Sequence, residues 1–314
     1  MYRPMLRANC LHRHSSHGRL LFVLPALLLV LSACEPEAPD PEGHIDRLTS
    51  IDERNRKPAV EQLAAMGNEI VPRLIVEMSS SYTQVRFEVA HLLGRSRDPR
   101  AVPILIQALG DQSANVAQTA AWALGSIRSP AAVPALLAYT ADVSPGVRHQ
   151  VAWALGACHG DSLTPALADS AHRAVLQALT DPRAEVRQGA LLGIRELGLR
   201  GAVDQVIELA TDDSPEVRYL VVQLLEQLQN GGYGKTVGDL PEATRAGIVD
   251  ALIGLLDDAE HASIRTPAIR ALGRSRDERA VAPLTRVRDS GAQEDRAGAA
   301  QALTWLQTSL AEPE

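Results

Sequence analysis

The sequence predicts an all-α chain in which a short helical motif is repeated and stacked many times. Hydrophobic residues make up 46% of the 314 residues but aromatic residues only 3%, so the core must consist mainly of alanine, leucine and valine. That composition is unlike a β-sandwich or barrel, whose strands are rich in aromatic and β-branched residues. A motif of one apolar residue followed by arginine also recurs at intervals of 31 residues, and a period in this range is typical of solenoids. The net charge of −7 argues against a phosphate-backbone binder, which needs a basic surface.

Residues 1–33 have the organisation of a lipoprotein signal peptide. Four arginines and no acidic residue accompany a continuous apolar run at residues 20–31, which is too short to span a membrane as a mature helix. The run ends in Leu-Ser-Ala-Cys, which resembles the box in which the cysteine of a bacterial lipoprotein is acylated. We therefore predict lipidation at Cys34 and attachment to a membrane through its acyl chains. The alternative is an ordinary cleaved signal followed by a chance cysteine.

Residues 34–46 are predicted to be the lipidated cysteine and a tether. After Cys34 the segment 35–43 is rich in proline and acidic residues, and such a composition cannot build a core. Removal of the signal takes away four arginines and no acidic residue, which leaves a net charge of −11. Glu35 stands where aspartate commonly favours retention in the inner membrane. We therefore expect a cell-envelope protein at the outer membrane, facing the periplasm.

Residues 47–314 are predicted to form one repetitive domain. The first residue of the repeated motif, here called the signature residue, recurs at Val85, Val116, Val147, Val186, Val217 and Ile264. Asp295 stands at this position in the last unit. Four of the intervals are 31 residues, and the two longer ones contain insertions of 8 and 16 residues. Nine residues after the signature, four of the units carry a glycine: Gly94, Gly125, Gly156 and Gly273. This regularity indicates one solenoid and not two globular domains.

Each unit is predicted to contain two helices. Positions in the helix that contains the signature residue are counted from that residue, which is position 0. Positions 0, 4, 5, 7 and 8 are small or apolar and form one face, while positions 2, 3 and 6 point away from it. The other helix is an apolar segment such as residues 101–109, entered through Asp98-Pro99 as N-cap and first helical residue. Asp181-Pro182, Ser144-Pro145 and Ser214-Pro215 are expected to begin signature helices in the same way. One pair cannot bury both of its faces, so neighbouring pairs must stack.

The repeated pattern resembles a known family. Val-Arg-x-x-Ala-Ala-x-Ala-Leu-Gly, preceded by Leu-x-x-Ala-Leu-x-Asp, is similar to a HEAT repeat, and the 31-residue spacing is closest to the short variety in phycobilisome lyase subunits. The resemblance covers about residues 55–308, with a degenerate first unit near 58–75. It implies a right-handed α-solenoid of about eight stacked HEAT-like helix pairs. It does not assign an activity, because such repeats serve many unrelated tasks.

The resemblance also implies a structural role for charged residues that recur in the repeats. In HEAT-like stacks, such aspartates and arginines form a ladder of ion pairs between neighbouring units. The aspartates lie five residues before the signature, at Asp111, Asp142, Asp181 and Asp212. The arginines lie one residue after it, at Arg148, Arg187, Arg218, Arg265 and Arg296. Ala117 replaces the arginine in one unit, so we expect a weaker ladder there.

The outward positions 2, 3 and 6 of the signature helices are the candidate binding site. In HEAT-type solenoids this second helix lines the concave surface, and here its stripe is aromatic, histidine and glutamine with one charge, Glu88. Rigid rings anchor a ligand and amides orient it, so we predict a protein, peptide or glycan partner. Trp122 and Trp153 occupy equivalent positions, and we expect their rings side by side. The alternative is that the rings pack against neighbouring helices. The predicted binding residues are Phe87, His91, Gln118, Trp122, His149, Gln150, Trp153 and Tyr219.

Other chemical motifs are incomplete, so we predict no catalytic residue, no metal site and no cofactor. The segment 231–236 ends like a phosphate-binding loop, but Gln229 stands where the first glycine is required. We expect the whole insertion, 230–244, to be a flexible loop. The sequence Cys-His-Gly-Asp at 158–161 has no second Cys/His cluster at zinc spacing. No nucleophile motif is present.

The alternative function is an enzyme on the same scaffold. Deoxyhypusine hydroxylase has similar repeats and binds two irons through His-Glu pairs, but none of the nine histidines here is followed by glutamate. Its cytosolic substrate, like that of a bilin lyase, conflicts with an export signal. HEAT-like DNA glycosylases need a basic groove, and this chain has only Lys57 and Lys235 as lysines. We therefore predict a non-enzymatic, lipid-anchored envelope scaffold with no nucleic-acid partner.

Overall fold

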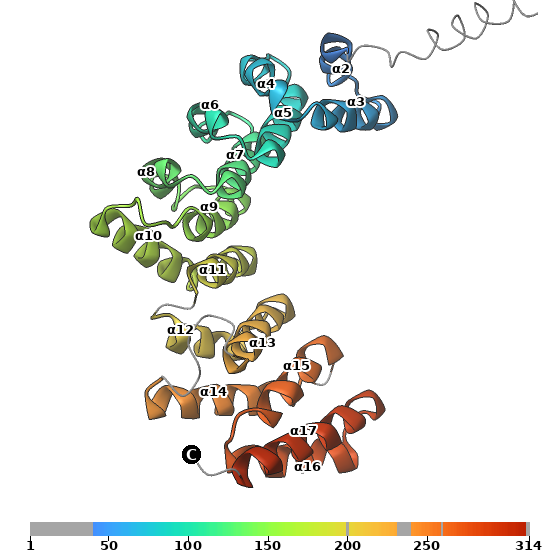
Figure 1. Ribbon diagram of the computed structural model, residues 1–314, viewed down its shortest axis with the longest axis vertical. Helices are drawn as coiled ribbons and strands as arrows, with labels where there is room; N and C mark the ends of the chain where they lie inside the picture. Colours follow the sequence, from blue (N-terminus) through green and yellow to red (C-terminus); the bar gives the residue numbers. More distant parts are fainter. Residues whose placement is uncertain (1–39, 199–200, 231–239, 259, 312–314) are drawn as a thin grey trace, which may run out of the picture. The chain divides into compact units, whose positions relative to one another are not determined.

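The computed structural model describes residues 40–198, 201–230, 240–258 and 260–311, and within these the chain is all-α, with sixteen α-helices in eight consecutive pairs (Figure 1). The predicted signal, Cys34 and residues 231–239 of the insertion lie outside the described residues. The first helices of the pairs are α2 (Pro41–Arg47), α4 (Val71–Glu77), α6 (Val102–Ala108), α8 (Val133–Leu137), α10 (Pro165–Ala178), α12 (Val203–Glu208), α14 (Glu242–Leu255) and α16 (Val281–Ser290). The second, or signature, helices are α3 (Glu53–Ala65), α5 (Thr83–Ser96), α7 (Ala114–Ile127), α9 (Pro145–Ala157), α11 (Ala184–Leu197), α13 (Pro215–Gln229), α15 (Ala262–Gly273) and α17 (Gln293–Ala311).

Contacts between neighbouring signature helices run through the series from α3 to α17. Neighbouring first helices are also in contact at two places, between α8 and α10 and between α12 and α14. The predicted α-solenoid of about eight pairs is therefore confirmed. Among the described residues, no helix has both the length and the apolar character needed to cross a membrane.

The folded chain begins earlier than the sequence indicates. Residues 41–46, which the sequence assigns to the tether, form most of helix α2. Ile45 and Leu48 are buried in the core of the first pair. The first unit is consequently the pair α2–α3, and the segment near 58–75 belongs to two different pairs.

The predicted helix entrances are confirmed at some units and wrong at one. Helices α9 and α13 begin at Pro145 and Pro215, directly after their N-cap serines. Asp98 caps a short 3₁₀ turn by accepting a hydrogen bond from the Arg100 amide at 2.9 Å, and α6 follows that turn. Asp181 does not begin α11, because its carboxylate accepts from the Arg183 amide in a turn, and the helix starts at Ala184 with Arg183 as its N-cap.

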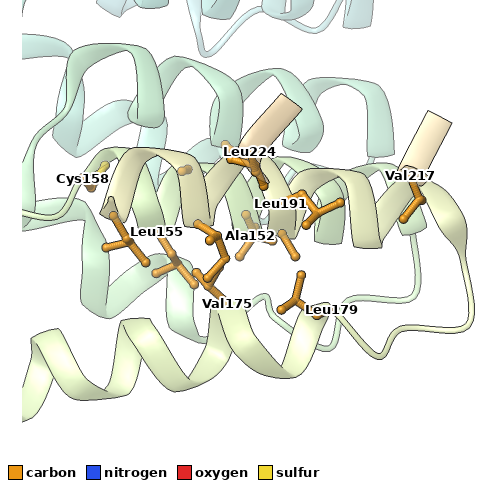
Figure 2. Packing of buried hydrophobic residues seen from close by; sticks show 14 of the residues in the cluster. Ala152, Leu155, Cys158, Val175, Leu179, Leu191, Val217 and Leu224 are labelled. Carbon is orange, nitrogen blue, oxygen red and sulfur yellow. The ribbon is translucent and has the colours of Figure 1, made fainter. Parts of the chain in front are cut away.

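Small residues allow the signature helices to approach closely. Figure 2 shows Ala152 and Leu155 of α9 gathered with Val175 of α10 and Leu191 of α11. A Cβ atom on Gly156 would lie 2.3 Å from the carbonyl oxygen of Gly193 on α11, so these two backbones meet directly. This close approach explains how the core is filled with few aromatic side chains.

The predicted ladder is confirmed, and each rung joins one unit to the next. The arginine after the signature residue reaches an aspartate of the following unit, with shortest N···O distances of 2.6 to 2.9 Å. Four of these aspartates lie in the turn before the next signature helix, and Asp295 lies in the first turn of α17. Its Nη1 also donates to a backbone carbonyl of its own turn. The rungs are Arg86–Asp111, Arg148–Asp181, Arg187–Asp212, Arg218–Asp258 and Arg265–Asp295. Arg296 makes no such rung and donates to the Gly291 carbonyl at 2.9 Å, because the last pair has no following unit among the described residues.

The ladder has the predicted gap at Ala117. The next aspartate, Asp142, keeps its hydrogen bond from the Ser144 amide at 2.8 Å, as Asp111 keeps that from Ser113. No arginine from α7 reaches its carboxylate, because position 1 of that helix is alanine. Asp111 and Asp142 are therefore a matched pair of turn aspartates that differ in their arginine.

Candidate functional site

The outward positions of α5, α7, α9, α11 and α13 form a shallow and mostly uncharged surface, here called the signature face. It consists of positions 2, 3 and 6 of these five helices. Most of its side chains are half-buried, Tyr219 is exposed, and Thr119 and Gly189 are buried. The predicted stripe thus faces outward, but most of its members also contact a neighbouring helix.

The two tryptophans pack against the preceding helix. A Cβ atom on Gly94 would lie 2.7 Å from Cζ3 of Trp122, and one on Gly125 would lie 2.6 Å from Cζ3 of Trp153. Each ring therefore occupies space that a glycine leaves free nine residues after the signature of the previous unit. The ring of Trp122 also lies against that of His91, with centroids 5.1 Å apart and planes at 30°. Both tryptophans fill grooves between neighbouring helices and present only part of their surface to solvent.

The two histidines of the face have fixed surroundings. Burial, and then the positive charge of Arg95, lower the pKa of His91 below its ordinary value, so His91 is neutral at pH 7. Nδ1 of His149 donates to the carbonyl of Glu185 on α11 at 2.5 Å. That bond leaves Nε2 of His149 as the acceptor in the neutral ring.

A row of side-chain amides on three successive helices makes no hydrogen bond to the protein. Gln118 of α7, Gln150 of α9 and Gln188 of α11 have no hydrogen-bond partner within the described part of the chain. Gln118 lies against Gly146, where a side chain would collide with its Oε1. Gln223 differs, because its amide donates to the hydroxyl of Tyr219 at 2.7 Å. The free amides provide donors and acceptors that a ligand can satisfy.

Two pockets open on the signature helices, on either side of the tryptophans. One of about 330 Å³ lies between α3 and α5 and is lined by Phe87, His91 and Arg95 among others. A second of about 330 Å³ lies between α11 and α13 and is lined by Leu192, Arg195 and further residues of both helices. Neither groove is filled by a tryptophan, since position 6 of its later helix is His91 on α5 or Gln223 on α13.

The pockets hold the charges of the site. Arg95 and Arg195 are exposed, and neither forms an ion pair within the described residues. Glu88 is different, because its carboxylate accepts from Arg56 of α3 at 2.9 Å. Sequence reasoning missed both arginines, although each stands at position 9 or 10, directly beyond the stripe.

No metal centre emerges from the described residues, because no group of three His, Cys, Asp or Glu side chains is placed to hold an ion there. Burial raises the pKa of the Cys158 thiol to about 12, and its Sγ donates to the carbonyl of Leu124 at 3.3 Å. Cys158 is therefore a protonated core residue. The predicted lipidation site, Cys34, lies outside the described residues.

A family model and one solved structure support the HEAT-repeat fold. The family model for HEAT repeats matches residues 42–114, 102–175, 172–243 and 234–304. Among solved structures, the Escherichia coli protein YibA is 18% identical, with 92% of this chain and 99% of that chain covered and a TM-score of 0.58. The CpcE–CpcF complex of phycocyanin lyase from Nostoc is 21% identical over 77% of this chain and 95% of that one, with a TM-score of 0.47. Human deoxyhypusine hydroxylase with glycerol is 20% identical over 91% and 99%, with a TM-score of 0.36. No curated protein matches the chain in sequence.

Proposed function

The chain belongs to the HEAT-repeat family, and on that basis we propose that it is a scaffold that binds a protein, peptide or glycan partner through its signature face. The observation that carries this proposal is the row of free amides at Gln118, Gln150 and Gln188. The three amides lie at outward positions 2 or 3 of successive helices, beside half-buried rings. An extended ligand that crosses the helices satisfies these amides one after another.

The spacing of the helices suits an extended chain. Packed helices lie about 8–10 Å apart, and an extended peptide advances about 3.3 Å per residue. A bound peptide therefore presents its backbone to a new signature helix about every third residue. The half-buried rings of Trp122 and Trp153 supply apolar contact between the amides, at a small cost in conformational entropy because packing already holds them.

We propose that the scaffold is attached to a membrane of the cell envelope through lipid on Cys34, as an outer-membrane lipoprotein that faces the periplasm. Support comes from the apolar run and the Leu-Ser-Ala-Cys box at residues 31–34. Cell fractionation tests this step alone. Replacement of Cys34 by serine is expected to release the protein from the membrane fraction, and continued membrane association of Cys34→Ser contradicts lipidation.

We further propose that binding, and not catalysis, is the activity of this chain. Its HEAT repeats carry none of the His-Glu pairs that the hydroxylase alternative requires. Metal analysis of the purified protein tests the alternative, because stoichiometric iron or zinc would favour an enzyme.

Chemical cross-linking in intact cells, followed by affinity capture, tests the binding face. The structure favours Gln118→Ala/Gln150→Ala as the test variant, since these side chains make no hydrogen bond to the described part of the protein while the tryptophans fill grooves. Gln107→Ala is the matched control, because Gln107 is an exposed glutamine on the first helix α6. We expect the double variant to lose a captured partner that the wild type and the control retain. Equal capture by all three proteins contradicts the proposed face.

A further inference from the structure

The loops that join the two helices of each pair expose apolar side chains in the N-terminal half of the chain. Ile51 is 98% exposed, Tyr82 60% and Val143 96%. Ile51 lies between α2 and α3, Tyr82 between α4 and α5, and Val143 between α8 and α9. Single apolar side chains are common on protein surfaces, but these three recur in the same kind of loop, and each gains free energy when a neighbouring apolar phase covers it.

The ladder shows that these three loops are equivalent. In each, a backbone carbonyl accepts Nη1 of the arginine that follows within the same unit: Arg56 reaches Ser50, Arg86 reaches Ser80, and Arg148 reaches Asp142. Successive signature helices from α3 to α9 are in contact, so the loops follow one another along one edge. We call this edge, formed by the loops within the pairs, the turn edge.

The apolar residues are confined to the pairs nearest the proposed anchor. The third pair has Gln112 at the place that Ile51 and Val143 hold in their loops, and later loops expose Arg183, Asp213 and Glu260. Single apolar side chains on separate loops do not form the contiguous centre that a protein interface requires. They suit a lipid surface, which accepts each side chain individually, and tyrosine is favoured at the boundary between headgroups and acyl chains.

The length of the tether permits this contact. Cys34 lies seven residues before Pro41, where α2 begins, so an extended tether reaches about 25 Å. Helix α2 has seven residues and is about 10 Å long. A lipid on Cys34 therefore holds the turn edge of the first pairs within reach of the bilayer at a high effective concentration.

We propose that the turn edge of the first four pairs docks on the surface of the lipid bilayer, with Ile51, Tyr82 and Val143 inserted among the headgroups. This inference rests on the proposed lipid anchor. It gives the anchored scaffold a defined orientation, in which the turn edge faces the membrane and the signature face points parallel to the membrane plane.

The test must report orientation without depending on acylation in cells. Residues 41–314 form a compact unit of their own, so the chain from Cys34 onward can be attached through the Cys34 thiol to maleimide lipid in phosphatidylcholine vesicles. Cys158 does not compete, because it is buried and its thiol stays protonated. Amide hydrogen exchange is then measured for the attached chain and for the same chain free in solution.

Docking is expected to slow exchange about tenfold or more in the loops around Ile51, Tyr82 and Val143, and to leave the loop around Asp213 unchanged. The variant Ile51→Ser/Tyr82→Ser/Val143→Ser is expected to lose this protection while it is attached equally well. Unchanged exchange in all four loops, or equal protection around Asp213, overturns the proposal. Fractionation of Cys34→Ser separately decides lipidation, so a failed anchor and a failed docking edge give different results.

Discussion

Replacement of Asp111 by asparagine removes one rung of the ladder and almost nothing else. The Asp111 carboxylate accepts from Nε and Nη2 of Arg86 at 2.6 and 2.9 Å, and from the Ser113 amide at 2.8 Å. Asparagine keeps an oxygen for the serine amide and loses the charge that balances the arginine. Asp142→Asn is the matched control, because Asp142 has the same bond to its serine amide and no ladder arginine from the preceding helix.

The size of the effect follows from burial. The side chains of Arg86 and Asp111 are 16% and 10% exposed. Loss of one partner from a fully buried ion pair costs about 3–5 kcal/mol, whereas a surface pair contributes about 0–1 kcal/mol. Arg86 also retains its bond to the Ser80 carbonyl. We therefore expect Asp111→Asn to lower the free energy of unfolding by about 2–3 kcal/mol, and Asp142→Asn by less than about 0.5 kcal/mol.

The same pair predicts a dependence on pH. The hydrogen bonds from Arg86 lower the pKa of Asp111 below its ordinary value. A carboxylate with a lowered pKa in the folded state stabilises the protein above its unfolded pKa, and this contribution is lost as the pH falls through the folded value. The difference between wild type and Asp111→Asn is thus expected to be constant near pH 7 and to shrink below about pH 4.

Urea unfolding followed by circular dichroism measures both effects. Because a repeat protein can unfold in segments, the midpoints and the slopes of the transition are compared together. Equal stabilities of Asp111→Asn and Asp142→Asn at pH 7 refute the ladder as a source of stability. A difference that persists unchanged at pH 3 refutes its assignment to the carboxylate charge.

Three further predictions concern the core and the grooves. Gly156→Ala is expected to destabilise the protein by more than about 2 kcal/mol, because the new Cβ meets the backbone of Gly193. Gly254→Ala has open space around its Cβ and is expected to stabilise the helix by about 0.5–1 kcal/mol; urea unfolding compares the two, and a similar loss in both contradicts the close packing. Cys158 should react with a thiol reagent only after urea is added, since its thiol is buried and its pKa is raised to about 12, and rapid labelling of the native protein would contradict this. Trp122→Ala is expected to cost about 2 kcal/mol by emptying its groove, whereas wild-type stability of that variant would show that the ring is not needed for packing.

The fold was predictable because its information is local and repeated. Every unit carries its own helix-start residues and its own apolar face, so one correct alignment assigns most of the chain. Helix α2 was missed because Pro41 and the acidic residues around it have the composition of a tether. Only the packing of Ile45 and Leu48 against the first signature helix shows that this segment is folded.

The sequence predicted which side chains of the candidate site face outward, but not how far each of them is buried. The alternation of outward residues along a helix identifies which side chains face away from the core, but not how far the preceding helix covers them. The missing information was present in the sequence, since Gly94 and Gly125 leave the space that Trp122 and Trp153 occupy. Spacing within one helix cannot reveal that relation, because it joins residues 28 positions apart in two different units.

Each groove between neighbouring signature helices can be filled by the chain itself or left open. Where position 6 is tryptophan and the previous unit offers a glycine, the ring fills the groove and the surface is held rigid. Where that residue is absent, as between α11 and α13, a pocket remains and an unpaired arginine, Arg195, stands at its edge. In the proposed binding face, the tryptophans therefore serve chiefly to fix the helices that carry the free amides. For this reason a change at Gln118 or Gln150 tests recognition, whereas a change at Trp122 tests packing first.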